Sequence, residues 1–286
     1  MRLLVPVIAS LAALVAGTGC ALPDASPDGK AAEADSAADE NAGFVRVAAS
    51  TFEMGCTPGQ SDCNVDETAH SVTLTQDYWV ATTEVTQGDF SATMGYNPSI
   101  FPDCGTTCPV ETVTWHEAAA YTNAVSLEAG LTECYACSGS ESVVRCEAAL
   151  DPYTCDGYRL LTEAEWEGAA RCGTDLLYAG SDDILAVGWI GKNSDGTTHI
   201  GASLAANACG IYDMSGNVWE WAHDWYGEKL VTASDPSGKS SGAIRSVRGG
   251  GVYNVAANAR VADRSADYPD TAGTSGVGVR LGRSQL

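Results

Sequence analysis

Cysteine is the residue type that most restricts how this chain can fold. The sequence of 286 residues holds 11 cysteines, and one of them, Cys20, directly follows an apolar N-terminal stretch. The others are even in number, which in an exported chain predicts a disulfide framework. They are Cys56, Cys63, Cys104, Cys108, Cys134, Cys137, Cys146, Cys155, Cys172 and Cys209.

The cysteine spacing leaves the connectivity open. Short loops favour the local pairs Cys56–Cys63 and Cys104–Cys108. The four cysteines of the Ser- and Gly-rich segment 134–155 are expected to pair among themselves, which leaves the last two for each other. The alternative for the four is a zinc site that begins with Cys134-x-x-Cys137 and adds Cys146 and Cys155. An oxidising compartment argues against zinc, because thiols pair with each other there.

The N-terminus has the features of an export signal. Arg2 precedes an apolar run from Leu3 to Gly17, which is too short to span a bilayer and typical of a signal peptide. The run ends at Gly17-Thr18-Gly19-Cys20, which resembles a bacterial lipobox with Gly in place of the usual Leu. We therefore predict a lipoprotein signal peptide over residues 1–20 and acylation of Cys20. The alternatives are ordinary secretion with cleavage nearby, and a Cys20 buried in a folded helix.

Residues 21–43 form the next segment and are predicted to be a disordered acidic tether. They contain six acidic residues against one Lys and no aromatic residue, so they cannot bury enough apolar surface to fold. The folded domain is expected over residues 44–286. An acylated Cys20 would hold that domain at the membrane without a spanning helix. The predicted location is therefore the bacterial cell envelope, anchored at the outer membrane or the periplasmic face, or the exterior if the chain is secreted.

The net charge of -22 restricts the possible partners. Such a surface repels nucleic acid and bare anionic membrane, and no basic stripe offsets it. It favours solubility and weak cation binding. We therefore expect no nucleic-acid partner.

Local patterns predict an α+β fold with little regular secondary structure. Residues 44–54 alternate around a turn and predict a hairpin, while 70–85 are β-branched and aromatic and predict one strand or two. A helix is predicted over 114–130, where Thr114 and Glu117 form a capping box. A second helix is predicted from Glu163 to Cys172, with Thr162 and Glu165 at its start.

Four stretches occur in an order that resembles a known family. They include Phe52-Glu53-Met54-Gly55, then 109–115 (PVETVTW), 158–167 (YRLLTEAEWE) and 207–221 (NACGIYDMSGNVWEW), with 247–250 (VRGG) downstream. Together they resemble the formylglycine-generating enzyme, or sulfatase-modifying factor, family. This resemblance covers about residues 44–283 and implies a variant of the C-type lectin fold, stapled here by disulfides.

The resemblance also implies a structural calcium ion. Its ligands would be Asp213, the carbonyl oxygens of Gly216 and Val218, and Glu220. Carboxylates and carbonyls around a Gly-Asn turn are the oxygen ligands that calcium prefers. The alternative is that both carboxylates only cap turns. Three tryptophans of this region are expected to lie in the core rather than on a ligand platform: Trp219, Trp221 and Trp225.

The chain departs from the family at its chemistry. Catalytic members carry two cysteines shortly after the Gly-Gly that precedes the final strands, and these thiolates bind copper. Here Gly249-Gly250 is followed by 251–260 (GVYNVAANAR), and no cysteine occurs after Cys209. We therefore expect no copper and predict no catalytic residue. The four histidines show no metal-binding spacing and are expected to be structural: His70, His116, His199 and His223.

Three functions remain open at this point. The favoured one is a non-catalytic module that binds a protein or glycan, through the segment after Gly250. Its candidate residues are Tyr253, Asn254, Asn258, Arg260, Asp263, Arg264 and Tyr268. The second is a formylglycine-generating oxidase, or a divergent metal-dependent relative, that uses an unseen ligand set. The third is a structural component of an envelope assembly.

Overall fold

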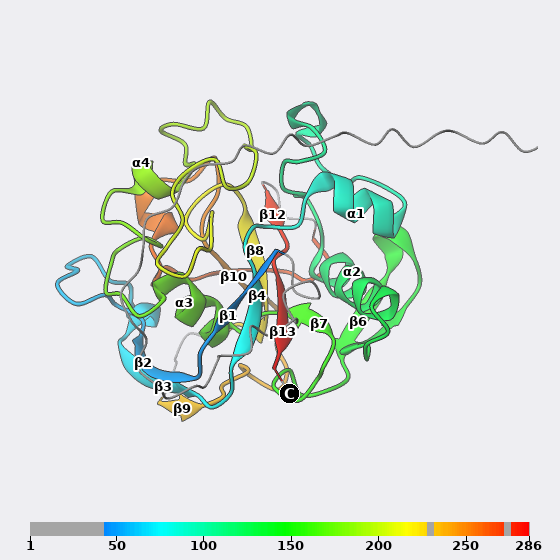
Figure 1. Ribbon diagram of the computed structural model, residues 1–286, viewed down its shortest axis with the longest axis horizontal. Coiled ribbons are helices and arrows are strands. Elements are labelled where there is room, and N and C mark those ends of the chain that lie inside the picture. The colour runs from blue at the N-terminus through cyan, green and yellow to red at the C-terminus, as the bar shows by residue number, and fades with distance from the viewer. Residues whose placement is uncertain (1–42, 228–231, 272–275, 286) are drawn as a thin grey trace, which may run out of the picture. The chain divides into compact units, whose positions relative to one another are not determined.

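The computed structural model describes residues 43–227, 232–271 and 276–285 (Figure 1). The predicted signal peptide, the acylated Cys20 and residues 21–42 of the predicted tether lie outside these ranges. No helix within the described ranges is long and apolar enough to cross a membrane.

Two four-stranded sheets form the middle of the molecule. The first has the order β1-β4-β13-β7, with every pair antiparallel, and consists of Phe44–Val47, Tyr78–Ala81, Leu281–Ser284 and Tyr158–Leu160. The second has the order β11-β10-β8-β12 and consists of Ser265–Asp267, Arg245–Arg248, Trp219–Trp225 and Val277–Gly278. In the second sheet β12 runs parallel to β8, whereas the other pairs are antiparallel.

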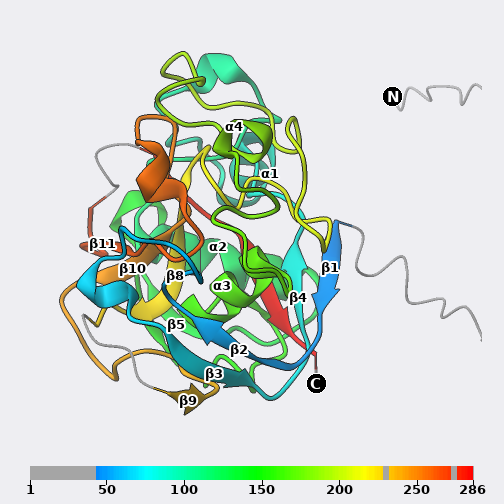
Figure 2. The ribbon, with the colours of Figure 1, turned by 90° about the vertical axis from the view of Figure 1, so that its left-hand side faces the viewer.

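Two smaller sheets and several helices complete the fold. A sheet of order β2-β3-β9 comprises Ser50–Met54, His70–Leu74 and Ala233–Ser234, and a hairpin comprises β5 (Tyr135–Ser138) and β6 (Arg145–Ala148). The α-helices are α1 (Gln87–Met94), α2 (Trp115–Glu128), α3 (Glu163–Arg171) and α4 (Ile184–Val187). Short 3-10 helices are η2 (Val65–Glu67), η3 (Pro102–Cys104), η4 (Glu141–Val143) and η5 (Ala256–Ala259). Figures 1 and 2 show α4 and long loops in the upper half and β2, β3 and β9 at the lower end.

The α+β prediction is confirmed, and so are both predicted helices. At the start of α2 the Thr114 hydroxyl accepts from the Glu117 N–H, and at α3 Thr162 does the same for Glu165. The segment 70–85 forms two strands, as predicted. The predicted hairpin over 44–54 is wrong, because β1 pairs with β4 and β2 pairs with β3.

The core lies on both sides of the central strands. One cluster gathers around α2 and includes Trp115, Leu160 and Trp221, all fully buried. The other gathers around α3 and includes Trp166 and Met214. Burying large aromatic side chains is the main stabilising contribution here. The core placement predicted for Trp219 and Trp221 is confirmed, while Trp225 is only half-buried.

All ten cysteines of the described residues form disulfides. The predicted local pairs Cys56–Cys63 and Cys104–Cys108 are confirmed. The segment 134–155 pairs internally, as Cys134–Cys155 and Cys137–Cys146. Cys172 pairs with Cys209. The zinc alternative is therefore wrong, because sulfur in a disulfide cannot serve as a thiolate ligand.

Candidate functional site

The turn that leads into β8 has a tightly constrained backbone. Asp213 and Asn217 have φ values of 58° and 61°, and Gly216 has a φ of 95°. A Cβ on Gly216 would lie 2.5 Å from the carbonyl oxygen of Trp189, so only glycine fits there. The Gly216 N–H donates to the Gly249 carbonyl and the Asn217 N–H to that of Trp189, both at 2.8 Å. The turn therefore holds its side chains in fixed directions.

Glu220 follows this turn and is bound to a buried arginine. Arg280 Nη2 donates to Glu220 Oε1 at 2.7 Å, and Arg280 Nε donates to Oε2 at 3.0 Å. Trp166 Nε1 also donates to Oε2, at 2.7 Å. Glu220 therefore has its charge balanced inside the protein, and each of its two oxygens already accepts two hydrogen bonds.

Two other buried carboxylates beside this pair each have one oxygen without a partner in the described part of the chain. Glu84 Oε1 and Asp213 Oδ1 are enclosed and accept no hydrogen bond from the described residues. Glu84 Oε2 accepts only a long bond of 3.4 Å from Asn217, and Asp213 Oδ2 accepts from the Ala202 N–H at 2.7 Å. Burial raises the pKa of Glu84 well above its usual range, and the nearby Asp213 adds to the effect. Burial likewise raises the pKa of Asp213.

This chemistry fits a hard cation. A buried charge without a partner is strongly destabilising, whereas a cation between two carboxylates would supply the missing contacts. The described residues hold no cluster of three or more His, Cys, Asp or Glu side chains placed to bind a metal. A calcium ion would therefore need backbone carbonyl oxygens, such as those predicted at Gly216 and Val218, beside Asp213 and Glu84.

Glu84 was not among the site residues predicted from the sequence. It lies in Thr83-Glu84-Val85, just after β4, and it is 3% exposed. The available signal was an acidic residue between two β-branched residues. Such a position is usually apolar when it is buried, so a carboxylate there indicates a special role. Glu84 becomes a candidate site residue because the fold brings it near Asp213, which is far away in the sequence.

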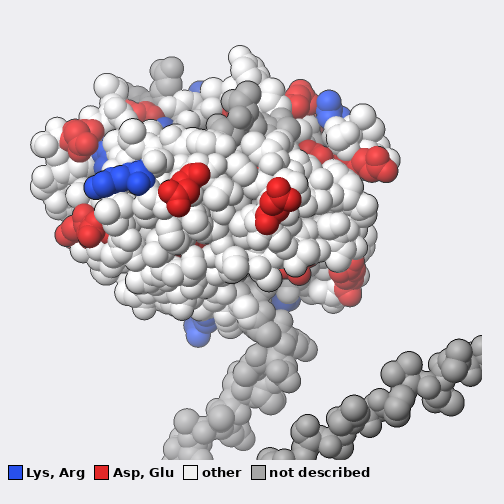
Figure 3. Space-filling model, turned by 90° about the horizontal axis from the view of Figure 1, so that it is seen from above, with Lys and Arg blue, Asp and Glu red and all other residues white. Residues whose placement is uncertain are grey.

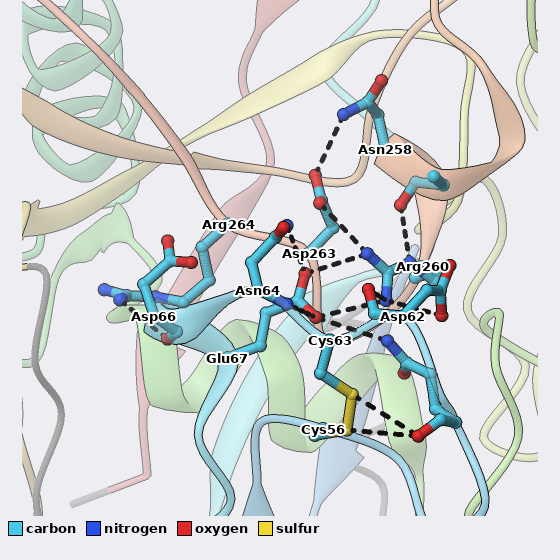
Figure 4. A network of polar contacts seen from close by, with 12 residues as sticks. Cys56, Asp62, Cys63, Asn64, Asp66, Glu67, Asn258, Arg260, Asp263 and Arg264 are labelled. Atoms are coloured by element: carbon cyan, nitrogen blue, oxygen red, sulfur yellow. Dashed lines mark hydrogen bonds and ion pairs between the residues drawn. A yellow bond between two sulfur atoms is a disulfide. The ribbon is translucent and has the colours of Figure 1, made fainter.

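The arginines of the predicted binding segment are buried, and Figure 4 shows Arg260 facing Glu67. Arg260 is 4% exposed and its two Nη atoms donate to the two oxygens of Glu67, at 3.1 and 3.0 Å. Arg264 is 6% exposed and donates to both oxygens of Glu163, at 2.6 and 2.8 Å. Each arginine forms a bidentate ion pair with a buried carboxylate, so the guanidinium groups connect distant segments of the chain.

Asp263 and Asn258 belong to the same network. Asp263 Oδ1 lies 3.6 Å from Arg260 Nη2, and Asn258 Nδ2 donates to Asp263 Oδ2 at 3.5 Å. Burial raises the pKa of Asp263 to about 6, and the neighbouring Glu67 acts in the same direction. Asn258, Arg260 and Asp263 thus form one network of the interior, and their role in binding stays a prediction.

Tyr253 has a different environment and is exposed. Its ring centroid lies 5.9 Å from that of Phe101, and Tyr253 and the nearby Val255 are 53% and 67% exposed. Ile100, beside Phe101, is 53% exposed. We call these four residues the Tyr253 surface: Ile100, Phe101, Tyr253 and Val255. The face seen from above in Figure 3, toward which η3 projects in Figures 1 and 2, carries few charged side chains.

Backbone contacts make the Tyr253 surface rigid. Asn254 Oδ1 accepts from Trp219 Nε1 at 2.9 Å and from the Gly251 N–H at 3.0 Å. The Asn254 carbonyl accepts from the Gly191 N–H, and Ser194 Oγ donates to the Val252 carbonyl at 2.7 Å. Asn254 therefore orients the loop that carries Tyr253.

Tyr268 lies apart from the Tyr253 surface. It is 60% exposed and lines a hollow with His116, Arg145 and Asp270. None of the four residues of the Tyr253 surface lines this hollow. The predicted segment therefore does not form one continuous surface.

Comparison with known proteins identifies the family. The model of the sulfatase-modifying factor enzyme 1-like domain matches residues 30–285. The chain belongs to this family. Among solved structures, Treponema denticola variable protein 1 is 29% identical, with a TM-score of 0.76 over 85% of this chain and 95% of that protein. This likeness confirms the fold that the motifs implied for the sulfatase-modifying factor domain.

Curated relatives match over part of their length. Chaperone protein LppX of Paenibacillus barcinonensis is 34% identical over 186 residues, which cover 54% of this chain and 65% of LppX. The formylglycine-generating enzyme of Streptomyces coelicolor is 36% identical over 136 residues, which cover 40% of this chain and 43% of that enzyme. The match thus spans less than two thirds of each of these two relatives.

Proposed function

We propose that this chain is a lipid-anchored binding module of the cell envelope, which carries a sulfatase-modifying-factor-like domain without oxidase chemistry. The observation that supports this most directly concerns sulfur. Every cysteine of the described residues is in a disulfide, and the segment after Gly250 contains none. Copper(I) is held by soft thiolate ligands, so the folded part offers it no such site.

The ligand-binding part of this proposal is the Tyr253 surface. Exposed aromatic and aliphatic side chains on a rigid loop are typical of contact surfaces for proteins or glycans. Asn254 contributes by fixing the loop rather than by touching the ligand. A protein ligand is favoured over a glycan, because the similar protein from Paenibacillus barcinonensis is named a chaperone.

Calcium has a structural role in this proposal. Asp213 and Glu84 would bind the ion together with backbone carbonyls, and Glu220 would remain paired with Arg280. The ion would neutralise two buried charges and hold the turn before β8. That turn also contacts Gly249 and Trp189, so calcium would stabilise the loops that support Tyr253.

Two experiments test the proposal. In the first, the mature chain is incubated with copper and a sulfatase-derived cysteine peptide, and mass spectrometry follows the peptide. An unchanged mass is expected, and conversion to the aldehyde would overturn the proposal.

The second experiment is a binding screen against envelope proteins and glycans, with and without calcium. Wild type should bind a partner that the Tyr253→Ala variant does not bind, whereas Tyr268→Ala should retain binding. Equal binding by wild type and Tyr253→Ala would reject the Tyr253 surface.

A further inference from the structure

A partly open cavity lies at the N-terminal end of α3. The cavity has a volume of about 300 Å³ and is bordered by the ends of β2 and β8, by β9 and by residues 236–239. Its walls are largely apolar and include Met54, Ala164, Trp225, Ala233 and Pro236. This volume is at the lower end for ligand pockets, and suits one long side chain or a small molecule.

Asp224 is the carboxylate that borders this cavity. It is 4% exposed. Its Oδ2 accepts a hydrogen bond of 2.8 Å from the N–H of Glu163, which is the first residue of α3. Its Oδ1 accepts no hydrogen bond from the described residues. This oxygen is not completely shielded from solvent, so it remains accessible from the cavity. Capping of α3 therefore explains one oxygen of Asp224 but not the other.

Among the residues that the structure describes, no charged neighbour of Asp224 forms an ion pair with it. Arg264 is the nearest arginine of the cavity wall, but both oxygens of Glu163 already neutralise it. Arg245 stacks between the rings of Trp115 and Trp225, and its Nη1 donates to the His223 carbonyl. Lys239 at the cavity is exposed and forms no ion pair with the described residues. A buried carboxylate that has no counterion within the described ranges favours a cationic ligand.

We propose that this cavity binds an ammonium or guanidinium group at the end of an apolar stem, with Asp224 as its counterion. The apolar walls would enclose the stem, and Asp224 Oδ1 would accept from the charged end. The net charge of -22 also draws cations toward the protein. A basic side chain of a protein partner and a free diamine share this chemistry. The proposal is independent of the Tyr253 surface, none of whose residues lines the cavity.

The proposal predicts a particular pH dependence. Burial, followed by the charge of Glu163, raises the pKa of Asp224 to about 8. Glu165 acts in the same direction and Arg264 in the opposite one, while His70, Lys239, Tyr153 and Arg245 also lie near this carboxyl. A cation binds the ionised form best, so affinity should rise with pH up to about 8 and then level off. Binding at pH 7 should release a proton.

Calorimetry with defined probes tests the cavity directly. The probes are Nα-acetyl-lysine methylamide, its arginine equivalent, cadaverine, and Nα-acetyl-norleucine methylamide as an uncharged isostere. The charged probes should bind the full chain at least about tenfold more tightly than norleucine, because only they pair with the carboxylate. Tighter binding of the amino-acid probes than of cadaverine would indicate a protein partner. Tighter binding of cadaverine would indicate a free diamine, and either result would support the cavity as a cation-binding site. Binding of norleucine equal to that of lysine would overturn the proposal.

Matched variants separate binding from folding. Asp224→Asn keeps an acceptor for the Glu163 N–H but removes the charge, and should weaken the charged probes at least about tenfold. Ala233→Leu should block the cavity without touching the carboxyl, whereas Ser234→Leu, on the opposite face of β9, should leave binding unchanged. Lys239→Met removes a competing cation and should not weaken binding. Unchanged affinity in both Asp224→Asn and Ala233→Leu would reject the site, and so would the failure of every charged probe to bind wild type.

Discussion

Two groups of buried charges in this molecule differ in whether the protein itself completes them. In the network of Figure 4, Arg260 faces Glu67 with two hydrogen bonds, and each group neutralises the other. Beside β8, Glu84 and Asp213 are equally buried, but each keeps an oxygen without a partner among the described residues. The first arrangement connects distant parts of the chain. The second leaves carboxylate oxygens that the described residues do not satisfy, and the calcium proposal rests on this difference.

The largest expected effect comes from breaking the paired network. Arg260→Ala leaves Glu67 buried without a counterion, and should lower the free energy of unfolding by about 3–5 kcal/mol. Arg46→Ala is the matched control, because Arg46 and Asp77 form an ion pair at the surface. Its loss should be below about 1 kcal/mol. Chemical denaturation of both variants measures the contrast, and equal losses would contradict the structural role assigned to Arg260.

Calcium should have the next largest effect, and on the unpaired group alone. At a concentration of 100 times its Kd, the ion should raise the free energy of unfolding by about 2.7 kcal/mol. Glu84→Gln and Asp213→Asn should remove this gain, and should themselves stabilise the calcium-free protein by relieving charge repulsion. Glu53→Gln, at an exposed position, is the control. Thermal unfolding in EDTA and in calcium measures this, and a calcium response that persists in both variants would reject the site.

A smaller effect of pH should arise inside the paired network. The pKa of Asp263 is raised from 3.8 to about 6, so between these values the folded state holds a proton that the unfolded chain has released. Its contribution to stability is therefore present below pH 4 and is lost as the pH rises through 6. Asp263→Asn should flatten the dependence of Tm on pH in this window. A curve with the same slope as that of wild type would contradict the assignment.

The smallest effect on stability is expected at the Tyr253 surface. Tyr253→Ala removes a half-exposed ring that contacts Phe101, and the free energy of unfolding should change by about 0.5 kcal/mol or less. Binding should nevertheless be lost, which distinguishes a recognition residue from a structural one. A large loss of stability would instead show that Tyr253 has a structural role, like Arg260.

Local signals in the sequence predicted local structure correctly. The capping boxes at Thr114 and Thr162 lie next to the helices they start, so the boundaries of α2 and α3 could be read from a few neighbouring residues. Short spacing likewise predicted the two local disulfides, Cys56–Cys63 and Cys104–Cys108, whereas the pairing within 134–155 required the structure. The hairpin over 44–54 failed because each strand has its partner elsewhere, in β4 or β3.

Charges proved harder to interpret than helices because their meaning depends on remote partners. Arg260 is 193 residues from Glu67, and Arg264 is 101 residues from Glu163. From the sequence these arginines were expected on a binding surface. Glu84 was missed for the same reason, since nothing near it in the chain indicates Asp213. The family motifs gave the fold, but only the three-dimensional arrangement separates paired carboxylates from unpaired ones.

The position of β13 has a consequence for how the protein is made. Leu281–Ser284 lies between β4 and β7, so it completes the middle of a sheet whose other strands come much earlier in the sequence. A nascent chain halted before residue 281 would leave β4 and β7 without the strand between them. The first sheet can therefore be completed only after residues 281–284 have been synthesised.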